Sequence, residues 1–245
     1  MLKYATITNN GSREVNEDSL GAYEKDGNYG FIVCDGLGGH GMGDLASQCV
    51  RDTFEDQFGK TDDMVNFLGQ VFITAQQILL EEQEKKRAGN KMKTTAVAMV
   101  TDDRNAYIGH VGDSRLYVFA KNKVKVRTLD HSIPQMLVLS KQIKEKEIRH
   151  HKDRNILLRV MGVEWEEPMY ELMAPMDLRK CQAFLLCTDG FWELIEEEEM
   201  CALLKKATTP EEWLLEMENV VKANGLGKSM DNYSAIAVWT EKKRG

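Results

Sequence analysis

The stretch 31–47 constrains the fold of this chain most strongly, because a short apolar run leads directly into a turn rich in glycine. Residues 31–34 are apolar and typical of a buried strand, and Asp35 follows at the end of that strand. Five glycines lie between positions 36 and 43, and glycine permits backbone conformations and close approaches that larger residues block. A helical pattern starts at Asp44. The sequence therefore predicts a strand that presents Asp35 at a tight turn before a helix.

Two other interpretations of this stretch have to be weighed. Gly36, Gly38 and Gly41 match the G-x-G-x-x-G spacing of dinucleotide-binding folds. Such a fold returns after about twenty residues to a second strand that ends in an acid, whereas here a helical pattern continues to about residue 89. An aspartate at the end of the strand would also repel a pyrophosphate, so a cation is the better partner for Asp35. The simplest alternative is a tight turn with an acid that caps the helix.

Composition restricts the class of protein. The chain has 245 residues, 42% of them hydrophobic, and a formal net charge of -7, which argues against a nucleic-acid partner because phosphate backbones select basic surfaces. No apolar run approaches the length of about 18 residues that a membrane span needs. The five cysteines are odd in number and form no C-x-x-C pair, as expected of reduced thiols. We expect a cytoplasmic protein with neither a nucleic-acid nor a membrane partner.

The pattern of apolar residues predicts strands surrounded by helices. Antiparallel strands are expected within the first 35 residues, with the polar segment 11–18 between two of them. Four strands between Thr95 and Leu129 are separated by short gaps, which predicts a meander. The pattern is helical and basic from Asp130 to Met161. No repeat or linker divides the chain, so we expect a single domain, 1–245. The other expected elements are helices at 44–58, 62–88, 196–207 and 209–225 and strands at 183–187 and 234–239.

Four aspartates stand where expected strands begin or end: Asp35, Asp113, Asp189 and Asp231. Strand ends can converge at one end of a sandwich of sheets, and carboxylates brought together there repel one another unless cations hold them. Oxygen ligands without paired Cys or His favour a hard ion, Mg²⁺ or Mn²⁺. A turn-forming role explains any one of these aspartates, but it explains all four together poorly.

At this point the chain resembles a family, the metal-dependent protein phosphatases, or type 2C serine/threonine phosphatases, in their compact bacterial form. The resemblance runs in order through almost the whole chain. It implies an α+β fold, a β-sandwich of two antiparallel sheets flanked on both sides by helix pairs, with a flap at about 130–162. The segments that carry it are Arg13 with 16–18, 35–47, 94–95, 112–115, 130–132, 155–162, 188–190 and 231–232.

The resemblance also implies a metal site. Asp35 would bridge two Mn²⁺ or Mg²⁺ ions, and Asp18 would hold a water molecule on the metal. The carbonyl of Gly36 would bind the first ion, while Asp189 and Asp231 would bind the second.

Further roles follow from the same resemblance. Asp113, together with Asp189, would bind the third ion present in many family members. Arg13 would grip the substrate phosphate as a bidentate fork. His40 would protonate the departing serine or threonine oxygen.

The expected activity is hydrolysis of phosphoserine and phosphothreonine by a metal-activated water, without a phosphoenzyme. The expected partners are phosphorylated proteins, substrates of a cognate serine/threonine kinase, and we expect the enzyme to act as a monomer. A pseudophosphatase that binds phosphoproteins without cleaving them is the alternative, although every expected ligand is present. A nucleotide-binding module is disfavoured by the missing second strand.

The expected flap carries a local positive charge on an acidic protein. Between Lys141 and Arg159 there are seven Lys/Arg and three acids, an excess of +4. A solvated surface is the simpler interpretation. The alternative is a preference for acidic substrates, carried by Lys141, Lys144 and Lys146.

Overall fold

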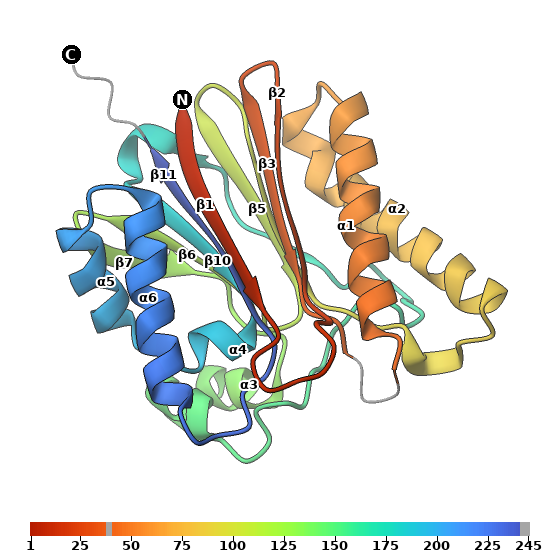
Figure 1. Ribbon diagram of the computed structural model, residues 1–245. Helices are drawn as coiled ribbons and strands as arrows, with labels where there is room; N and C mark the ends of the chain where they lie inside the picture. Colours follow the sequence, from red (N-terminus) through yellow and green to blue (C-terminus); the bar gives the residue numbers. More distant parts are fainter. Residues whose placement is uncertain (38–40, 241–245) are drawn as a thin grey trace.

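Two antiparallel sheets pack face to face in the computed structural model, which describes residues 1–37 and 41–240 (Figure 1). The first sheet has the order β1-β11-β10-β6-β7, formed by Leu2–Asn9, Tyr233–Thr240, Ala183–Cys187, Arg115–Ala120 and Lys123–Arg127. The second has the order β2-β3-β4-β5-β8, with β9 also paired to β5. Its strands are Ser19–Lys25, Asn28–Cys34, Ala96–Thr101, Asn105–Val111, Glu171–Leu172 and Met176–Asp177.

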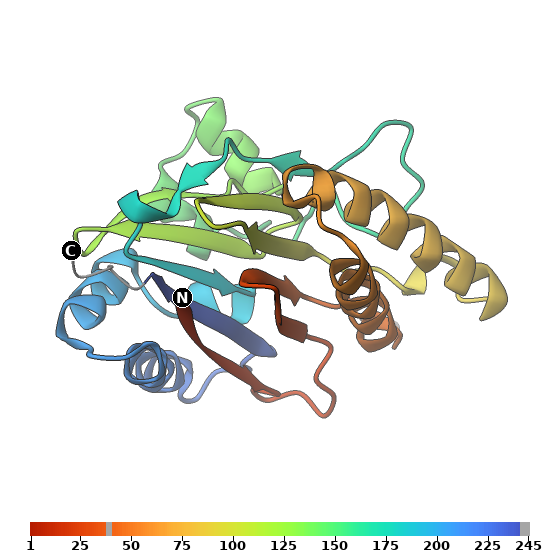
Figure 2. The same ribbon diagram turned by 90° about the horizontal axis from the view of Figure 1, so that it is seen from above.

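Helices cover both outer faces of this sandwich, as the view from above shows (Figure 2). The pair α1 (Gly43–Lys60) and α2 (Met64–Lys85) lies on the second sheet, and the pair α5 (Glu197–Lys206) and α6 (Pro210–Gly225) lies on the first. Buried side chains accordingly form three layers, one between the sheets and one beneath each helix pair. The expected order of layers, helix-sheet-sheet-helix, is confirmed.

Local chemistry explains where the helices begin and end. The Thr209 hydroxyl accepts the backbone N–H of Glu212 at 3.2 Å, and Pro210 takes the first helical position, where no N–H is needed. Helix α5 carries acids in its first turn and lysines in its last, as the helix dipole favours. No helix within 1–37 and 41–240 is both long enough and apolar enough to cross a membrane.

The meander expected between Thr95 and Leu129 is wrong. Strands β4 and β5 are neighbours in the second sheet, but β6 and β7 are neighbours in the first. The chain crosses from one sheet to the other at 112–114, where Gly112 has a φ of +100°. Short gaps predict a turn but do not distinguish a hairpin from a change of sheet, which is decided by packing between the sheets.

The helical pattern expected from Asp130 to Met161 is only partly correct. This segment contains α3 (Ile133–Leu139) and the short 3-10 helix η2 (Glu145–His150), and the remainder is turn and irregular chain. Further short elements were not expected, because a single turn of helix leaves no periodic signal: α4 (Asp189–Trp192), η1 (Gly89–Lys91) and η3 (Leu178–Lys180).

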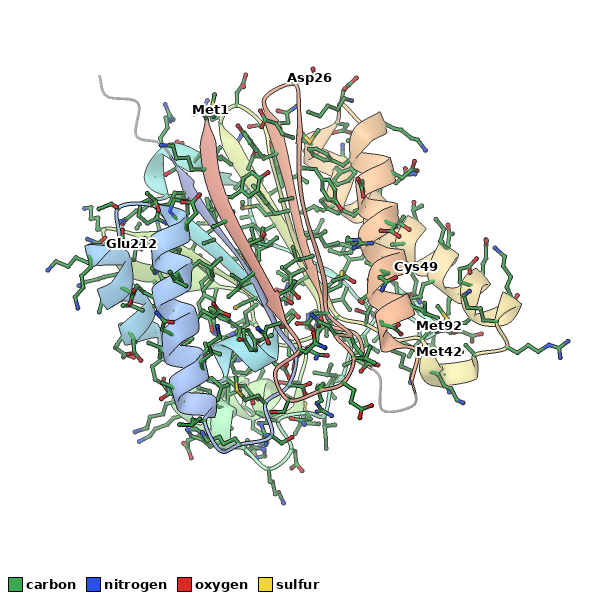
Figure 3. The ribbon with its side chains drawn as sticks, viewed as in Figure 1. Met1, Asp26, Met42, Cys49, Met92 and Glu212 are labelled. Carbon is green, nitrogen blue, oxygen red and sulfur yellow. The ribbon has the colours of Figure 1, made fainter. Side chains whose placement is uncertain are left out.

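The predicted aspartates lie at one end of the sandwich. Strand β1 begins beside Met1, and the β2–β3 hairpin turns at Asp26, both at the top of Figure 3. Met42 and Met92 lie at the opposite end, where they pack against the core beneath α1 and α2 (Figure 3). Strand β3 runs towards that lower end and there delivers Asp35.

Removing the aromatic ring of Phe184 tests the layer between the sheets. The ring is fully buried in that layer, so Phe184→Ala should lower the free energy of unfolding by about 3–5 kcal/mol. Urea unfolding followed by circular dichroism measures the change. Leu215→Ala on α6 is the control, because Leu215 is 54% exposed and its change should stay within about 0.5 kcal/mol. Equal effects of the two substitutions would contradict this account of the core.

Candidate active site

Asp35 is held by backbone and hydroxyl contacts from the neighbouring strand. Its carbonyl accepts the N–H of Thr95 at 2.9 Å and the hydroxyl of Thr94 at 2.8 Å, while its own N–H donates to the Thr95 hydroxyl at 3.1 Å. These three bonds fix the direction in which the carboxyl group leaves the strand. The paired threonines belong to the motifs quoted above, but their role as clamps on Asp35 could not be read from the sequence.

Gly36 allows three segments to meet behind Asp35. Its N–H donates to the carbonyl of Glu17 at 3.1 Å. A Cβ at this position would lie 2.3 Å from the carbonyl oxygen of Gly43 and 2.5 Å from that of Glu17, so a side chain would force the backbone apart. Glycine is therefore required here by close approach.

Asp18 and Asp189 are joined through Thr188, which lies between β10 and α4. The Thr188 hydroxyl donates to Asp18 Oδ2 at 3.0 Å and accepts the N–H of Ser234 at 3.0 Å. Asp18 is buried, and its Oδ1 has no hydrogen-bond partner among the residues that the structure describes. A buried carboxylate oxygen without a hydrogen-bond partner lowers the stability of the fold unless another group binds it.

Asp113 is fixed from two sides where the chain changes sheet. The indole Nε1 of Trp192 donates to the Asp113 carbonyl at 3.0 Å, and the N–H of Gly112 donates to His131 Nδ1 at 3.1 Å. Burial lowers the pKa of His131 to about 3, so the ring is neutral and Nδ1 can accept this bond. His131 was part of a quoted motif, but its contact with Gly112 appears only in three dimensions.

Asn232 organises the loop that carries Arg13. Its Oδ1 accepts the N–H of Glu17 at 2.8 Å, and its Nδ2 donates to the carbonyls of Asn10 and Val15 at 2.9 and 3.0 Å. One amide side chain thus ties both ends of the polar loop to the start of β11. Arg13 itself donates from Nη2 to Asp231 Oδ2 at 2.9 Å.

These side chains converge on a hollow of about 440 Å³ at the lower end of the sandwich. Asp18 lies just behind it, close enough to Asp189 and Asp231 to raise its pKa. His40 lies outside the described residues. Glu17, Leu37, Asn155 and Leu157 lie within the segments quoted above, but no role in the site was expected of them. The residues lining the hollow are Arg13, Glu17, Asp35, Gly36, Leu37, Asp113, Asn155, Leu157, Asp189 and Asp231.

Burial and mutual repulsion disfavour charge on the clustered carboxyl groups. Burial and then the charge of Asp189 raise the pKa of both Asp35 and Asp113 well above the usual range. Burial and then the charge of Asp231 raise the pKa of Asp189 itself. Burial, with the nearby charges of Asp189 and Asp231, raises the pKa of Asp18 to about 7 against two hydrogen bonds that lower it.

This donor set fits divalent metal ions. The groups are all oxygen donors, they are crowded enough to repel one another, and one buried oxygen of Asp18 has no partner in the described ranges. Mg²⁺ and Mn²⁺ prefer such ligands, and a nearby cation reverses the rise in carboxyl pKa. With Arg13 at the rim, the hollow suits a metal-dependent hydrolase that acts on an anionic group.

Two of the seven cations in the basic segment are paired with acids outside it. Arg149 is buried, and it donates to the carbonyls of Trp192 and Ile195 and pairs with Glu197 at 2.9 Å. Arg154 pairs with Glu193 at 3.1 Å. The excess of +4 in this segment therefore overstates the positive charge that is available to attract an acidic substrate.

The three lysines expected to select acidic substrates lie elsewhere. Lys141, Lys144 and Lys146 are exposed, and none of them lines the hollow. This placement agrees with the solvated-surface interpretation. The cations beside the site are Arg13 and Lys228 from other segments and Arg149 and Arg154 from the basic segment itself.

Comparison with known proteins agrees with the fold. The family model for protein phosphatase 2C matches residues 8–231. The serine/threonine phosphatase stp of Listeria monocytogenes serotype 4b is 31% identical over 235 residues, which are 92% of this chain and 90% of that protein.

Solved structures are similar over nearly the whole chain. The serine/threonine phosphatase Stp1 from Staphylococcus aureus is 28% identical with a TM-score of 0.87, covering 99% of this chain and 96% of that one. The phosphatase PstP/Ppp of Mycobacterium tuberculosis has a TM-score of 0.84 at 23% identity, covering 98% and 99%, and so shares the fold. The class is thus that of the metal-dependent phosphoprotein phosphatases. The chain belongs to the protein phosphatase 2C family.

Loss of the Asn232 amide should loosen the loop that carries Arg13. Asn232→Ala removes three hydrogen bonds to the backbone of that loop, which should cost about 1–3 kcal/mol of unfolding free energy and lower phosphatase kcat/KM by about tenfold. Urea unfolding and initial rates measure the two effects. Asn224→Ala is the control, since Asn224 donates one exposed bond to Leu194. If both variants behaved like wild type, Asn232 would have no role in holding the loop.

Proposed function

We propose that this protein hydrolyses phosphoserine and phosphothreonine in proteins, using divalent metal ions held by the carboxylate cluster. The observation that carries the proposal is the convergence of Asp35, Asp113, Asp189 and Asp231 on one hollow with Arg13 at its rim. Family membership and relatives named serine/threonine phosphatases support it. A PstP catalytic domain of the same fold, 22% identical, has been solved with two manganese ions.

Each member of the cluster has a proposed role. Asp35 and the Gly36 carbonyl would hold one Mn²⁺ or Mg²⁺ ion, and Asp35, Asp189 and Asp231 would hold a second. Asp113 with Asp189 would hold a third ion. When bound, such ions make a water molecule a nucleophile near neutral pH and balance the charge of the phosphate. The clamp of Thr94 and Thr95 on Asp35 keeps its carboxyl group aimed into the hollow.

Arg13 and Asp18 act around that centre. The guanidinium of Arg13, which is 56% exposed, is free to turn from Asp231 to the substrate phosphate and bind two of its oxygens. Asp18, held by Thr188, orients water through the oxygen that has no hydrogen-bond partner within 1–37 and 41–240. General-acid catalysis by His40 stays a prediction, because His40 lies outside the described residues.

A covalent phosphoenzyme finds no support. None of the five cysteines, all of them within the described ranges, lines the hollow. Burial raises the pKa of Cys34 and Cys187, so these thiols stay protonated and unreactive. A pseudophosphatase finds no support either, since the expected carboxylates are present and converge.

We further infer the domain organisation, the oligomeric state, the compartment and the partner kinase of the protein. The chain acts as one domain, 1–245, because the hollow draws on residues from 13 to 231. A single copy of the chain supplies every residue needed for the proposed site, so a monomer suffices for the activity. Free cysteines suit the reducing cytoplasm. There it reverses phosphorylation by a cognate serine/threonine kinase. Faster cleavage of phosphothreonine than of phosphotyrosine in matched peptides tests the substrate class.

Metal removal should abolish both turnover and a metal-dependent gain in stability. Hydrolysis of a phosphothreonine peptide should require Mn²⁺ or Mg²⁺ and stop in excess EDTA. Mn²⁺ at about 100 times its Kd should raise Tm by about 5–10 °C, because it relieves repulsion in the folded state only.

Asp35→Asn is the matched control for this measurement. It should lose the Mn²⁺-dependent rise in Tm and about a thousandfold or more of kcat. Full activity of the wild type in excess chelator would overturn the metal-dependent mechanism.

Substitution of Arg13 should separate phosphate binding from chemistry. Arg13→Ala should raise KM by about tenfold or more, as expected for the loss of charged hydrogen bonds worth about 1.5–3 kcal/mol, with a smaller change in kcat. Arg13→Lys keeps the positive charge but cannot bind two phosphate oxygens as a fork, so its KM should lie between those of the wild type and Arg13→Ala. Arg51→Ala on α1, where Arg51 pairs with Asp52, controls for the loss of an arginine. A wild-type KM in Arg13→Ala would exclude Arg13 from phosphate binding.

A further inference from the structure

A second hollow of about 430 Å³ adjoins the one that holds the carboxylates. The two hollows share four lining residues, Arg13, Asn155, Asp189 and Asp231. A group bound in one hollow therefore lies directly beside a group bound in the other. The volume falls within the range of about 300–1,000 Å³ typical of ligand pockets. The second hollow is thus large enough for a side chain next to the phosphorylated residue.

Cations form the outer wall of this second hollow. Arg154 is 40% exposed, and its Nε donates to Glu193 at 3.1 Å. Lys228 is exposed and has no ion-pair partner among residues 1–37 and 41–240. Arg149 also borders the hollow, but its charge is matched by Glu196 and Glu197. Lys228 is therefore the unpaired cation on this wall within the described ranges, and Arg154, which pairs with Glu193 but is 40% exposed where Arg149 is buried, is the second cation that an occupant can reach.

The backbone holds Lys228 in this position. The Lys228 N–H donates to the carbonyl of Gly225 at 3.0 Å. Two residues on, the N–H of Met230 donates to the Ser12 hydroxyl at 3.1 Å, and the Ser12 N–H donates to the Met230 carbonyl at 3.0 Å. The lysine is thus tied to the loop of Arg13, which the proposed function places on the phosphate.

We propose that Arg154 and Lys228 form a second anion subsite, which binds an acidic or second phosphorylated side chain close to the scissile phosphate. This proposal rests on the proposed function. In an extended peptide, side chains two residues apart point the same way and are about 6–7 Å apart. The second anion therefore stands two residues before or after the phosphorylated residue. Metal ions held in the first hollow would offset Asp189 and Asp231, and Lys228 and Arg154 would then face the occupant from the outer wall.

Four sets of phosphothreonine peptides test the subsite. They differ only two residues before or after the phosphothreonine, where they carry Glu, Gln, Lys or phosphoserine. The Glu and phosphoserine sets separate a carboxylate from a phosphate as the second anion. The wild type should cleave the Glu peptide about tenfold faster in kcat/KM than the Gln peptide at low salt, as for two exposed ion pairs of up to about 1 kcal/mol each. Higher salt should reduce that ratio.

Matched double variants test whether Arg154 and Lys228 cause the preference for the Glu peptide. Arg154→Gln with Lys228→Gln should bring the Glu-to-Gln ratio to about one. Lys141→Gln with Lys144→Gln removes the same charge from exposed lysines that line neither hollow, and should keep the wild-type ratio. Equal cleavage of all peptides by the wild type, or a ratio that survives in the Arg154/Lys228 variant, would overturn the subsite and leave the proposed function intact.

Binding provides a readout that does not need turnover. Fluorescence anisotropy of the wild type in Mn²⁺, with non-hydrolysable phosphonate versions of the same peptides, should give tighter binding of the Glu and phosphoserine peptides than of the Gln peptide. This difference should disappear when Arg154→Gln and Lys228→Gln are added. If the wild type cleaved none of the peptides, the proposed function would fail, and the anisotropy ratio would still decide the subsite.

Discussion

Repulsion among carboxyl groups at one end of the sandwich is the interaction on which the rest of this structure depends. Burial and then the charge of Asp189 raise the pKa of Asp35 and Asp113, and a chain without strong restraints would move these groups apart. Threonine hydroxyls, an indole N–H and backbone amides instead hold each aspartate at a fixed strand end. The fold thus holds the carboxyl groups in an arrangement that is unfavourable without a divalent cation and favourable with one, as expected of a metal site.

The carboxyl groups can meet because strands from both sheets end at the same end of the sandwich. Strands β3 and β10 belong to different sheets, yet Asp35 and Asp189 follow them and their carboxyl groups are near enough to share a hydrogen bond. The crossing at Gly112 brings Asp113 to the same end from the connection between the sheets. Three apolar layers fix the separation of the sheets and so the spacing of these groups.

A buried ion pair connects the flap to this centre. Arg115, next to the Asp113 turn, donates to both oxygens of Asp130 at 2.8 and 2.6 Å and lies 3.4 Å over the ring of Trp192. Trp192 in turn holds the Asp113 carbonyl. Breaking a buried pair of this kind is costly because it leaves a charge without a partner. The start of the flap is therefore anchored to the same residues that place Asp113.

The sequence by itself determined most of the elements and the chemistry of the site. Apolar periodicity located the long helices and buried strands, and the aspartates at strand ends, with the order of motifs, indicated a metal site on an α+β sandwich. Local signals of this kind depend on neighbouring residues alone. Only the tertiary structure decided that the chain changes sheet at Gly112, that Arg149 is buried against Trp192, and that Arg154 and Lys228 lie beside the carboxylates. Those outcomes depend on contacts between residues far apart in the chain, which no local pattern records.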